Sequence, residues 1–344
     1  MKKATIYKIA REAGVSVTTV SRFFNNPNMV KEATRNKISE ICSKYEFRPS
    51  SIASAITTKK TKTVAILVPS FKEPMFVELI GGAEYILSRR GYCVSVFNAR
   101  QSIKRELEIA NIIDNRFIDG VILSGVYGNE KDKIFISEML KRKIPCIMVD
   151  RIIPDIDIPY VASNEYLGGR LAGEYVLSKG HCRIGIITYP REVYIMNERV
   201  RGFLEALGSK RQKECFIHEV PLEFNKIGPS IRSFIDKVLN NGPTAILNTS
   251  DSIAFFLIRI MREKGIRIPE DISIMGYDNI VYSNLITPSL STIHHDMEEI
   301  GKVVAKNLLY RIENGEYLNM KQIIDPRLMP RESVIDIRQK DEVI

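Results

Sequence analysis

From residue 63 onward, short runs of apolar residues alternate with longer stretches in which apolar residues recur at helical spacing. The short runs are typical of strands that are buried on both faces of a parallel sheet. They lie at 64–68, 92–97, 119–124, 145–149, 183–188, 244–247 and 272–275, and a helix is predicted over 75–89. Because the runs fall into two series, the pattern predicts two similar α/β lobes.

Two such lobes predict a small-molecule site between them, since ligands of open α/β sheets bind outside the carboxyl ends of the strands. We expect the chain to pass between the lobes near 160–163 and again near 290–293. The stretch 253–258 contains more consecutive apolar residues than one buried face of a helix requires. It is either part of a surface between subunits or a helix that is buried on all sides within one lobe.

The first sixty residues follow a different pattern, that of short helices. An apolar stripe preceded by Thr5, a candidate N-cap, predicts the first helix; the stripe comprises Ile6, Ile9, Ala10 and Ala13. Gly14 suits a helix end, and Ser16 can cap a second helix over 17–24 that stops at Asn25-Asn26-Pro27. Two short helices joined by a tight turn predict a helix-turn-helix unit, whose second helix enters the major groove of DNA.

The second helix offers side chains suited to base recognition. Val20 and Phe23 are expected to face the core, and the residues expected outward are Val17, Thr18, Ser21 and Arg22. An Arg can donate two hydrogen bonds to guanine, a methyl group can contact thymine, and hydroxyls can bind phosphates. A third helix, with Thr34, Ile38, Ile41, Cys42 and Tyr45 at helical spacing, is predicted to close a small core.

The charge of the chain is concentrated in this N-terminal segment. Residues 1–60 contain eight Lys and four Arg against four Glu, a net charge of +8, and the whole chain carries +9. Such an asymmetry is typical of a nucleic-acid-binding module attached to a near-neutral body. A basic tail in solvent is the alternative interpretation.

Several classes of protein are excluded by what the sequence lacks. No apolar run reaches the ~18 residues of a membrane span, and the N-terminus lacks a signal peptide's apolar region, so we expect a cytoplasmic protein with no membrane partner. The five cysteines are scattered without a CxxC pair and are expected to be mostly buried. The four histidines show no metal pattern, and His294-His295 are expected at a strand end.

The motif Thr5-Ile6-Tyr7-x-Ile9-Ala10-x-x-Ala13-Gly14-Val15-Ser16-x-x-Thr19-Val20-Ser21-Arg22, followed by Phe47-Arg48-Pro49, resembles the LacI/GalR-type (lactose-repressor) family. The resemblance continues along nearly the whole chain. Later matching segments are Asp119-Gly120-Val121-Ile122, Gly168-Gly169, Gly180-His181-x-Arg183-Ile184, Arg199-x-x-Gly202-Phe203, Gly276-Tyr277-Asp278 and Pro288-x-Leu290-Ser291-Thr292-Ile293.

The resemblance implies an all-α helix-turn-helix domain and a hinge helix, followed by an α/β two-lobed effector domain like that of periplasmic binding proteins. The expected boundaries are 1–48 for the DNA-binding domain, 49–61 for the hinge segment and linker, and 62–337 for the effector-binding and dimerisation domain. Lobe 1 is expected to comprise 62–161 and 294–323, and lobe 2 to comprise 164–290 and 324–337.

The implied function is that of a sequence-specific transcriptional regulator, by default a repressor. It would bind double-stranded operator DNA with palindromic half-sites as a homodimer, controlled by a sugar or related metabolite in the cleft. The tail 338–344 has no heptads, which argues against a tetramer. No GxSxG, P-loop or HExxH motif suggests an enzyme, and no cofactor or metal is implied. A DNA-binding protein that responds to no effector is the alternative.

The resemblance and the residue pattern together give two candidate sites. The DNA-binding candidates are Thr5, Ser16, Val17, Thr18, Thr19, Ser21, Arg22, Asn25, Ser50, Ala53 and Ile56. The effector-binding candidates are Ser70, Phe76, Asn197, Arg199, Phe224 and Asp278. Phe76 is expected to stack on a sugar or base, or else to pack within its own lobe.

The sequence departs from the family at several of these places. Glu73-Pro74-Met75-Phe76 stands where the family has Asn-Pro-aromatic-Phe, Ser163 replaces an Asp, and Ser250 replaces an Asn. In the hinge, Ser54 replaces an Arg and Ile56 replaces the Leu that wedges open the minor groove. An Ile can also kink DNA in this way. The alternative is that Ile56 only packs the hinge, a segment too short to be a stable helix alone.

We predict that DNA affinity resides in residues 1–60 and is strongly salt-dependent, because each neutralised phosphate releases counterions. Replacing Lys2, Lys3 or Lys59 should weaken binding to all sequences about equally. Arg22→Ala should cost about 1–3 kcal/mol and relax specificity at one base pair of each half-site. Titrations on operator and on random DNA at several salt concentrations measure both effects, and equal losses on the two DNAs for Arg22→Ala would contradict its role in base recognition.

Overall fold

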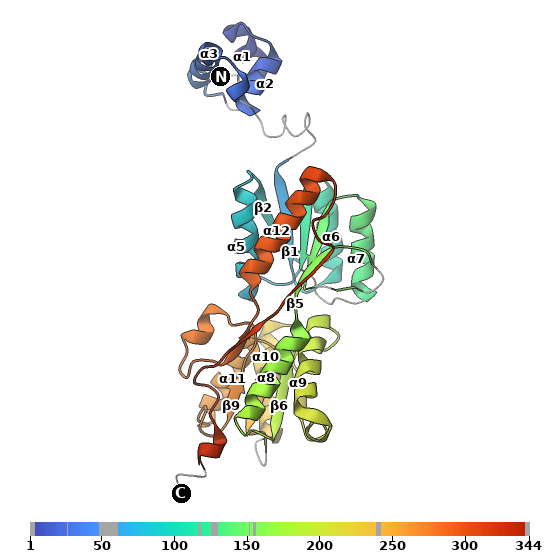
Figure 1. Cartoon of the computed structure of the whole chain (residues 1–344), viewed down its shortest axis with the longest axis vertical. Coiled ribbons are helices and arrows are strands. Elements are labelled where there is room, and N and C mark those ends of the chain that lie inside the picture. Colours follow the sequence, from blue (N-terminus) through green and yellow to red (C-terminus); the bar gives the residue numbers. More distant parts are fainter. Residues whose placement is uncertain are drawn as a thin grey trace. The chain divides into compact units, whose positions relative to one another are not determined.

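The structure, a computed structural model, describes residues 4–25, 27–47, 61–115, 118–124, 130–150, 152–153, 156–238 and 242–340. The chain divides into two compact units, Met1–Thr61 and Lys62–Ile344 (Figure 1). Each unit is built around its own core.

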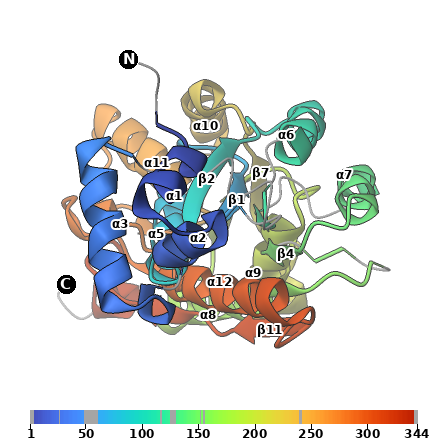
Figure 2. The ribbon, with the colours of Figure 1, turned by 90° about the horizontal axis from the view of Figure 1, so that it is seen from above.

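The first unit contains the three predicted helices. These are α1 (Ile6–Ala13), α2 (Val17–Asn25) and α3 (Glu32–Lys44), and they pack against one another (Figure 2). Gly14 ends α1 in the left-handed conformation, with φ 67°. The core side chains come from all three helices: Ile9, Ala10, Ala13, Val20, Ile38 and Cys42. The sequence prediction of a small three-helix core is therefore confirmed.

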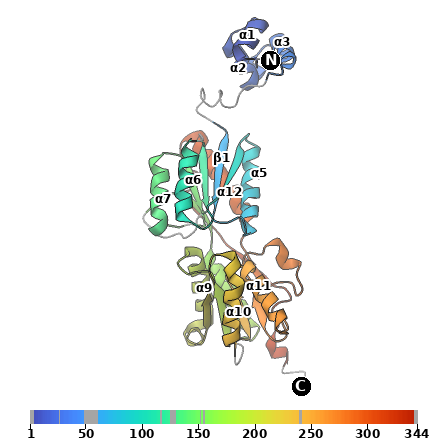
Figure 3. The same cartoon turned by 180° about the vertical axis from the view of Figure 1, so that it is seen from behind.

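The second unit contains a six-stranded parallel sheet in the order β11-β5-β4-β3-β1-β2. Its strands are β1 (Thr63–Val68), β2 (Cys93–Asn98), β3 (Gly120–Ser124), β4 (Cys146–Val149), β5 (Tyr160–Ser163) and β11 (Lys321–Ile324). Helices α5 (Met75–Ser88) and α12 (Met297–Asn314) cover one face, and α6 (Ile103–Asn115) and α7 (Glu130–Lys141) cover the other (Figure 3).

Strand β1 shows why the apolar runs are continuous. Val64, Ile66 and Val68 pack in the core beneath α5 and α12, whereas Ala65 and Leu67 pack in the core beneath α6 and α7. Successive side chains of a strand point to opposite faces, so a sheet covered on both faces needs apolar residues at every position.

The unit also contains a four-stranded parallel sheet in the order β7-β6-β8-β9, built in the same way. Its strands are β6 (Ile184–Thr188), β7 (Phe216–Glu219), β8 (Ala245–Asn248) and β9 (Ser273–Met275). Helices α8 (Glu165–Ser178) and α9 (Tyr194–Gln212) contribute to one core, and α10 (Phe224–Val238) and α11 (Asp251–Glu263) to the other. A small antiparallel pair joins β10 (Thr292–His294) and β12 (Arg327–Met329).

The chain passes between the two sheets three times. The passages lie between β5 and α8, between β9 and α12, and between β11 and β12. We call the part built on the six-stranded sheet lobe 1 and the part built on the four-stranded sheet lobe 2. Three connections hold the lobes together, and the sequence pattern had indicated two of these places.

The strands that the pattern missed are short or lie at an edge. In β7 and β11 exposed and partly buried residues alternate or mix, so neither strand is a continuous apolar run. The stretch 253–258 is largely buried in α11: Ile253, Ala254, Leu257 and Ile258 are buried, and Phe255 and Phe256 pack against the core. Phe255 also packs against the core of lobe 1, so the stretch is buried within the chain but contacts both lobes.

The expectation that most cysteines are buried is wrong. Cys42 and Cys146 are buried, but Cys93 and Cys182 are exposed and Cys215 is partly buried. Cys93 begins β2, which lies at the edge of its sheet and is nowhere buried. Within the described residues, no helix is both long enough and apolar enough to cross a membrane.

Two glycines let α5 and α12 touch backbone to backbone. A Cβ at Gly82 would lie 2.0 Å from the carbonyl oxygen of Glu298, and one at Gly301 would lie 2.2 Å from the carbonyl oxygen of Leu79. Any larger side chain at either position must therefore force the helices apart.

We predict that Gly82→Ala lowers the free energy of unfolding by about 1–3 kcal/mol or more, because the added methyl group overpacks this crossing. Gly81→Ala is the matched control, since nothing lies within 4 Å of its Cβ position. Alanine there should instead stabilise the helix by up to about 1 kcal/mol. Urea unfolding of both variants checks the pair, and equal effects would contradict the close crossing.

Candidate DNA-binding surface and effector site

The two helices of the helix-turn-helix are capped as their sequences predict. The Thr5 hydroxyl accepts a hydrogen bond from the Lys8 backbone N–H at 3.4 Å. The Ser16 hydroxyl accepts one from the Thr19 N–H at 3.1 Å and lies 2.9 Å from the Thr19 hydroxyl. An N-cap typically contributes about 1 kcal/mol, so these hydroxyls hold the helix ends in place.

Fewer side chains of α2 are exposed to solvent than the sequence analysis predicts. Thr18 and Arg22 are exposed and Ser21 is partly buried. Val17, which was expected to point outward, is partly buried and packs against the three-helix core. The side chain of Asn25 and the hinge candidates Ser50, Ala53 and Ile56 lie outside the described residues.

A cavity of about 70 Å³ lies between the carboxyl ends of the two sheets. Its walls come from residues that follow β1, β2, β6, β8 and β9: Pro69, Ser70, Gln101, Tyr189, Ser250 and Asp278. Further lining residues are Glu73, Met75, Phe76, Val193, Ile195, Met196 and Leu222. The two lobes thus meet around a small cavity at the place where α/β sheets bind ligands.

Three of the six effector candidates line this cavity: Ser70, Phe76 and Asp278. Phe76 is only 9% exposed and also belongs to the core of lobe 1, so it packs within its own lobe, and its stacking on a ligand stays a prediction. Asn197 lies in α9 and does not line the cavity. Phe224 begins α10, is 36% exposed, and packs edge-on against Phe256 with ring centroids 5.1 Å apart.

Arg199 is fully buried and lies behind the cavity wall rather than in it. Its Nε and Nη2 donate to the Glu165 carboxylate at 2.6 and 3.2 Å, and its Nη1 donates to Asp278 at 2.9 Å. The guanidinium carbon also lies 3.7 Å from the centroid of the Tyr277 ring. Arg199 therefore does not line the cavity itself, but it contacts Asp278, which does.

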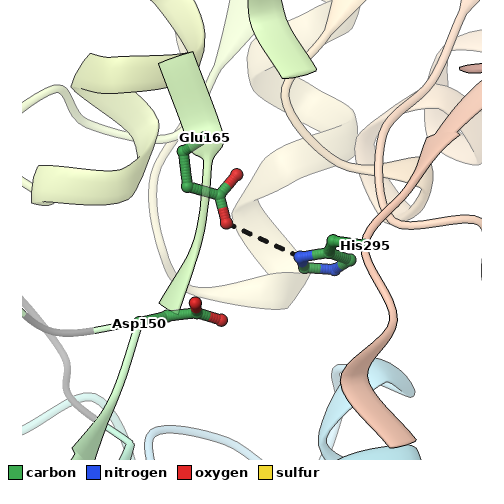
Figure 4. Close-up of side chains that lie close together, drawn as sticks. All are labelled: Asp150, Glu165 and His295. Atoms are coloured by element: carbon green, nitrogen blue, oxygen red, sulfur yellow. Dashed lines mark ion pairs between the residues drawn. The ribbon is translucent and has the colours of Figure 1, made fainter. Parts of the chain in front are cut away.

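His295, which the sequence analysis did not place in a site, completes this buried cluster, and Figure 4 shows it beside Glu165. Its Nδ1 lies 3.5 Å from Glu165 and its Nε2 lies 3.3 Å from Asp278. Burial by itself lowers the pKa of His295, but the nearby carboxylates of Asp278 and Glu165 outweigh burial and raise the pKa to about 10. Glu165 begins α8, just after the passage from β5, whereas Asp278 and His295 lie at two places in the segment between β9 and α12. The residues are therefore brought together by the fold, and no local pattern could have indicated the cluster.

Asp150, Glu165 and His295 have ligand atoms within 4.8 Å of one another, a spacing that suits a metal ion. Burial raises the pKa of Asp150 to about 6, and Arg199 keeps the pKa of Glu165 well below its usual range despite burial. A histidine with a raised pKa holds its proton and is a poor metal ligand, and the Glu165 oxygens already accept from Arg199. The arrangement is that of an ion-pair network.

Glu73 connects the two lobes directly across the cavity. Its two carboxylate oxygens accept hydrogen bonds from the hydroxyls of Tyr189 and Ser252, each at 2.8 Å. Glu73 follows β1 in lobe 1, Tyr189 follows β6, and Ser252 lies in the first turn of α11. The sequence showed that position 73 departs from the family, but it did not show which residues Glu73 contacts.

The comparisons with known proteins agree with this architecture. Residues 5–50 match the family described as bacterial regulatory proteins, lacI family, and residues 174–334 match the periplasmic binding protein-like domain. The HTH-type transcriptional repressor PurR of Vibrio atlanticus is 30% identical over 335 residues, which cover 96% of this chain and 98% of that protein. The chain belongs to the lacI family of bacterial regulatory proteins.

Other members of the lacI family are similar over comparable lengths. The ribose operon repressor of Haemophilus influenzae is 29% identical over 97% of this chain and 100% of its own. A lacI-family regulator from Enterococcus faecium with bound ribose is 27% identical, with a TM-score of 0.71 over 80% of this chain and 99% of its own. The lac repressor dimer bound to operator and an anti-inducer has a TM-score of 0.84, and the match covers 97% of this chain and 100% of that chain. At 22% identity, this similarity shows the shared fold.

These findings confirm the predicted fold class and regulatory function. The chain is a DNA-binding transcriptional repressor with a helix-turn-helix region and a periplasmic-binding-protein-like domain. The curated relatives of the lacI family named above are repressors and not enzymes.

We predict that His295 makes stability fall at alkaline pH. Its pKa is raised from 6.5 to about 10, so its contribution is complete below pH 6.5 and is lost as the pH rises through 10. The melting temperature of the wild type should therefore fall more between these pH values than that of His295→Gln. His218→Gln is the control, because burial lowers the pKa of that histidine. A wild type and a His295→Gln variant with parallel pH profiles would contradict this prediction.

Proposed function

We propose that this lacI-family chain binds a palindromic operator as a homodimer and that a sugar or related metabolite in the cavity between the lobes controls this binding. The observation that carries the proposal is the cavity, whose walls come from the carboxyl ends of both sheets. A ligand there contacts both lobes at once. Binding of the ligand therefore favours one arrangement of the lobes over others. Such a difference in affinity between two conformations is what couples an effector site to a DNA-binding site.

The DNA-binding part of the proposal rests on the first unit. Thr18 and Arg22 are exposed on α2, and residues 1–60 carry a net charge of +8. In our proposal Thr18, Ser21 and Arg22 face base edges, and Ser50, Ala53 and Ile56 act in the hinge. The capping hydroxyls of Thr5, Ser16 and Thr19 position the helices, and Asn25 follows at the end of α2.

The homodimer is supported by the size of the module and by a solved relative. A single helix-turn-helix module buries little DNA surface, and two-fold dimers match palindromic half-sites. The lac repressor is a dimer on its operator. We retain 1–48, 49–61 and 62–337 as the functional segments and propose that the protein acts in the cytoplasm. The division of the lobes follows β5 and β11, which keep residues 162–163 and Ile324 in lobe 1.

The effector class is supported by two relatives. One lacI-family structure holds ribose, and a curated relative represses a ribose operon. The cavity of this chain offers an aromatic side chain, Phe76, beside polar groups of Ser70 and Asp278, the usual composition of a sugar or nucleoside site.

The test begins with capture of genomic fragments by the full-length chain, which identifies an operator and the genes beside it. Fluorescence anisotropy on that operator is then measured with metabolites of the neighbouring genes. We predict that one of them shifts operator affinity by about 5–150-fold, the usual range of allosteric coupling. Asp278→Asn should remove this response and leave operator binding intact.

Surface variant Glu84→Gln is the matched control, since Glu84 is exposed on α5. A response that persists unchanged in Asp278→Asn would move the effector site elsewhere. A wild type that binds the operator but responds to no metabolite would favour the effector-independent alternative. A molecular mass measured by sedimentation that corresponds to a tetramer would contradict the proposed homodimer.

A further inference from the structure

Glu73 differs from the other carboxylates around the cavity in its partners. Asp278 has two cationic neighbours, Arg199 at 2.9 Å and His295 at 3.3 Å, and Glu165 also pairs with Arg199. The partners of Glu73 are the neutral hydroxyls of Tyr189 and Ser252. Among the described residues Glu73 forms no ion pair.

This arrangement leaves the Glu73 carboxylate at the cavity wall without a cation in direct contact from the described part of the chain, since Arg199 acts on it only at longer range. Burial is the main cause of a raised pKa at Glu73, and the charge of Asp278 adds to it. A carboxylate in such a place is stabilised by any cation that enters the cavity, because the low local dielectric strengthens the attraction.

Opening of the lobes frees both oxygens of Glu73. The cavity of about 70 Å³ has room for a few water molecules and not for a sugar, so the lobes must separate for a sugar to enter. Separation breaks the two hydrogen bonds that Glu73 accepts from lobe 2. A ligand that closes the lobes again must then supply hydrogen-bond donors to this carboxylate.

The side chain at this position restricts which ligands can do so. The family has an Asn here, which is uncharged and offers both a donor and an acceptor. The ionised Glu73 carboxylate, in contrast, carries a charge and only accepts hydrogen bonds. A hydroxyl group can donate a hydrogen bond to the Glu73 oxygens but does not compensate their negative charge. An ammonium group donates hydrogen bonds and also compensates the charge.

We propose that Glu73 selects an effector that carries a protonated amine, of the amino-sugar class, with the ammonium group on Glu73 and the ring beside Phe76. This inference rests on the proposed function, because it takes the cavity between the lobes as the effector site. It adds the charge of the effector, which that proposal leaves open.

Matched pairs of sugars that differ in one substituent test this charge preference. The probes are D-glucosamine with D-glucose and D-galactosamine with D-galactose, measured on the full-length chain by calorimetry and thermal shift near neutral pH. We expect the amino sugar of at least one pair to bind about tenfold more tightly than its hydroxyl counterpart, the ratio for a charge-assisted hydrogen bond over a neutral one.

Glu73→Gln should abolish this preference, and the control Glu84→Gln, which removes an exposed carboxylate from the same lobe, should retain it. Loss of the preference in Glu73→Gln alone supports the inference.

Three outcomes overturn it. Neutral sugars that bind as tightly as amino sugars overturn the inference and leave the proposed function standing. An amine preference that persists in Glu73→Gln assigns the charge recognition to another group. If no member of either pair binds, the amino-sugar class is wrong, and the operator assay with other metabolites then decides separately whether the cavity is the effector site.

Discussion

The buried guanidinium group of Arg199 is the interaction on which the effector domain depends most. It joins α9 to Glu165 at the start of α8 and to Asp278 after β9, and these two carboxylates also flank His295. Removing one partner from a buried ion pair typically costs about 3–5 kcal/mol, because the remaining charge is left uncompensated. Four segments that are distant in sequence are thus fixed relative to one another by charge.

Backbone geometry places these charges where they can meet. A Cβ at Gly169 would lie 2.1 Å from the Arg199 carbonyl oxygen, so only glycine lets α8 and α9 approach this closely. A Cβ at Gly276 would lie 2.1 Å from the Asp251 carboxylate. That carboxylate accepts hydrogen bonds from Ser283 and Thr292, which anchors the loop that carries Asp278. Gly169 and Gly276 therefore permit the close backbone approaches that bring the charged side chains together.

Much of the fold and only part of the site could be predicted from the sequence. Buried parallel strands such as β1 are continuous apolar runs, and caps such as Ser16 act on residues three positions away, so both leave local signals. The edge strand β7 has no such run. The contacts of Glu73 with Tyr189 and Ser252 join residues more than 100 positions apart. Only the topology of three passages between the lobes brings them together.

The glycine crossing of α5 and α12 has a mechanical consequence. With no side chains between them at this point, the backbones of the two helices are in direct contact, and close-packed contacts of this kind transmit displacement. Helix α5 begins at the cavity with Met75 and extends for 14 residues, about 21 Å. Past its far end, the Cys93 N–H donates to the carbonyl of Lys62, the first residue of the effector domain. A tilt of lobe 1 at the cavity thus becomes a displacement at Lys62, where the polypeptide from the DNA-binding unit enters.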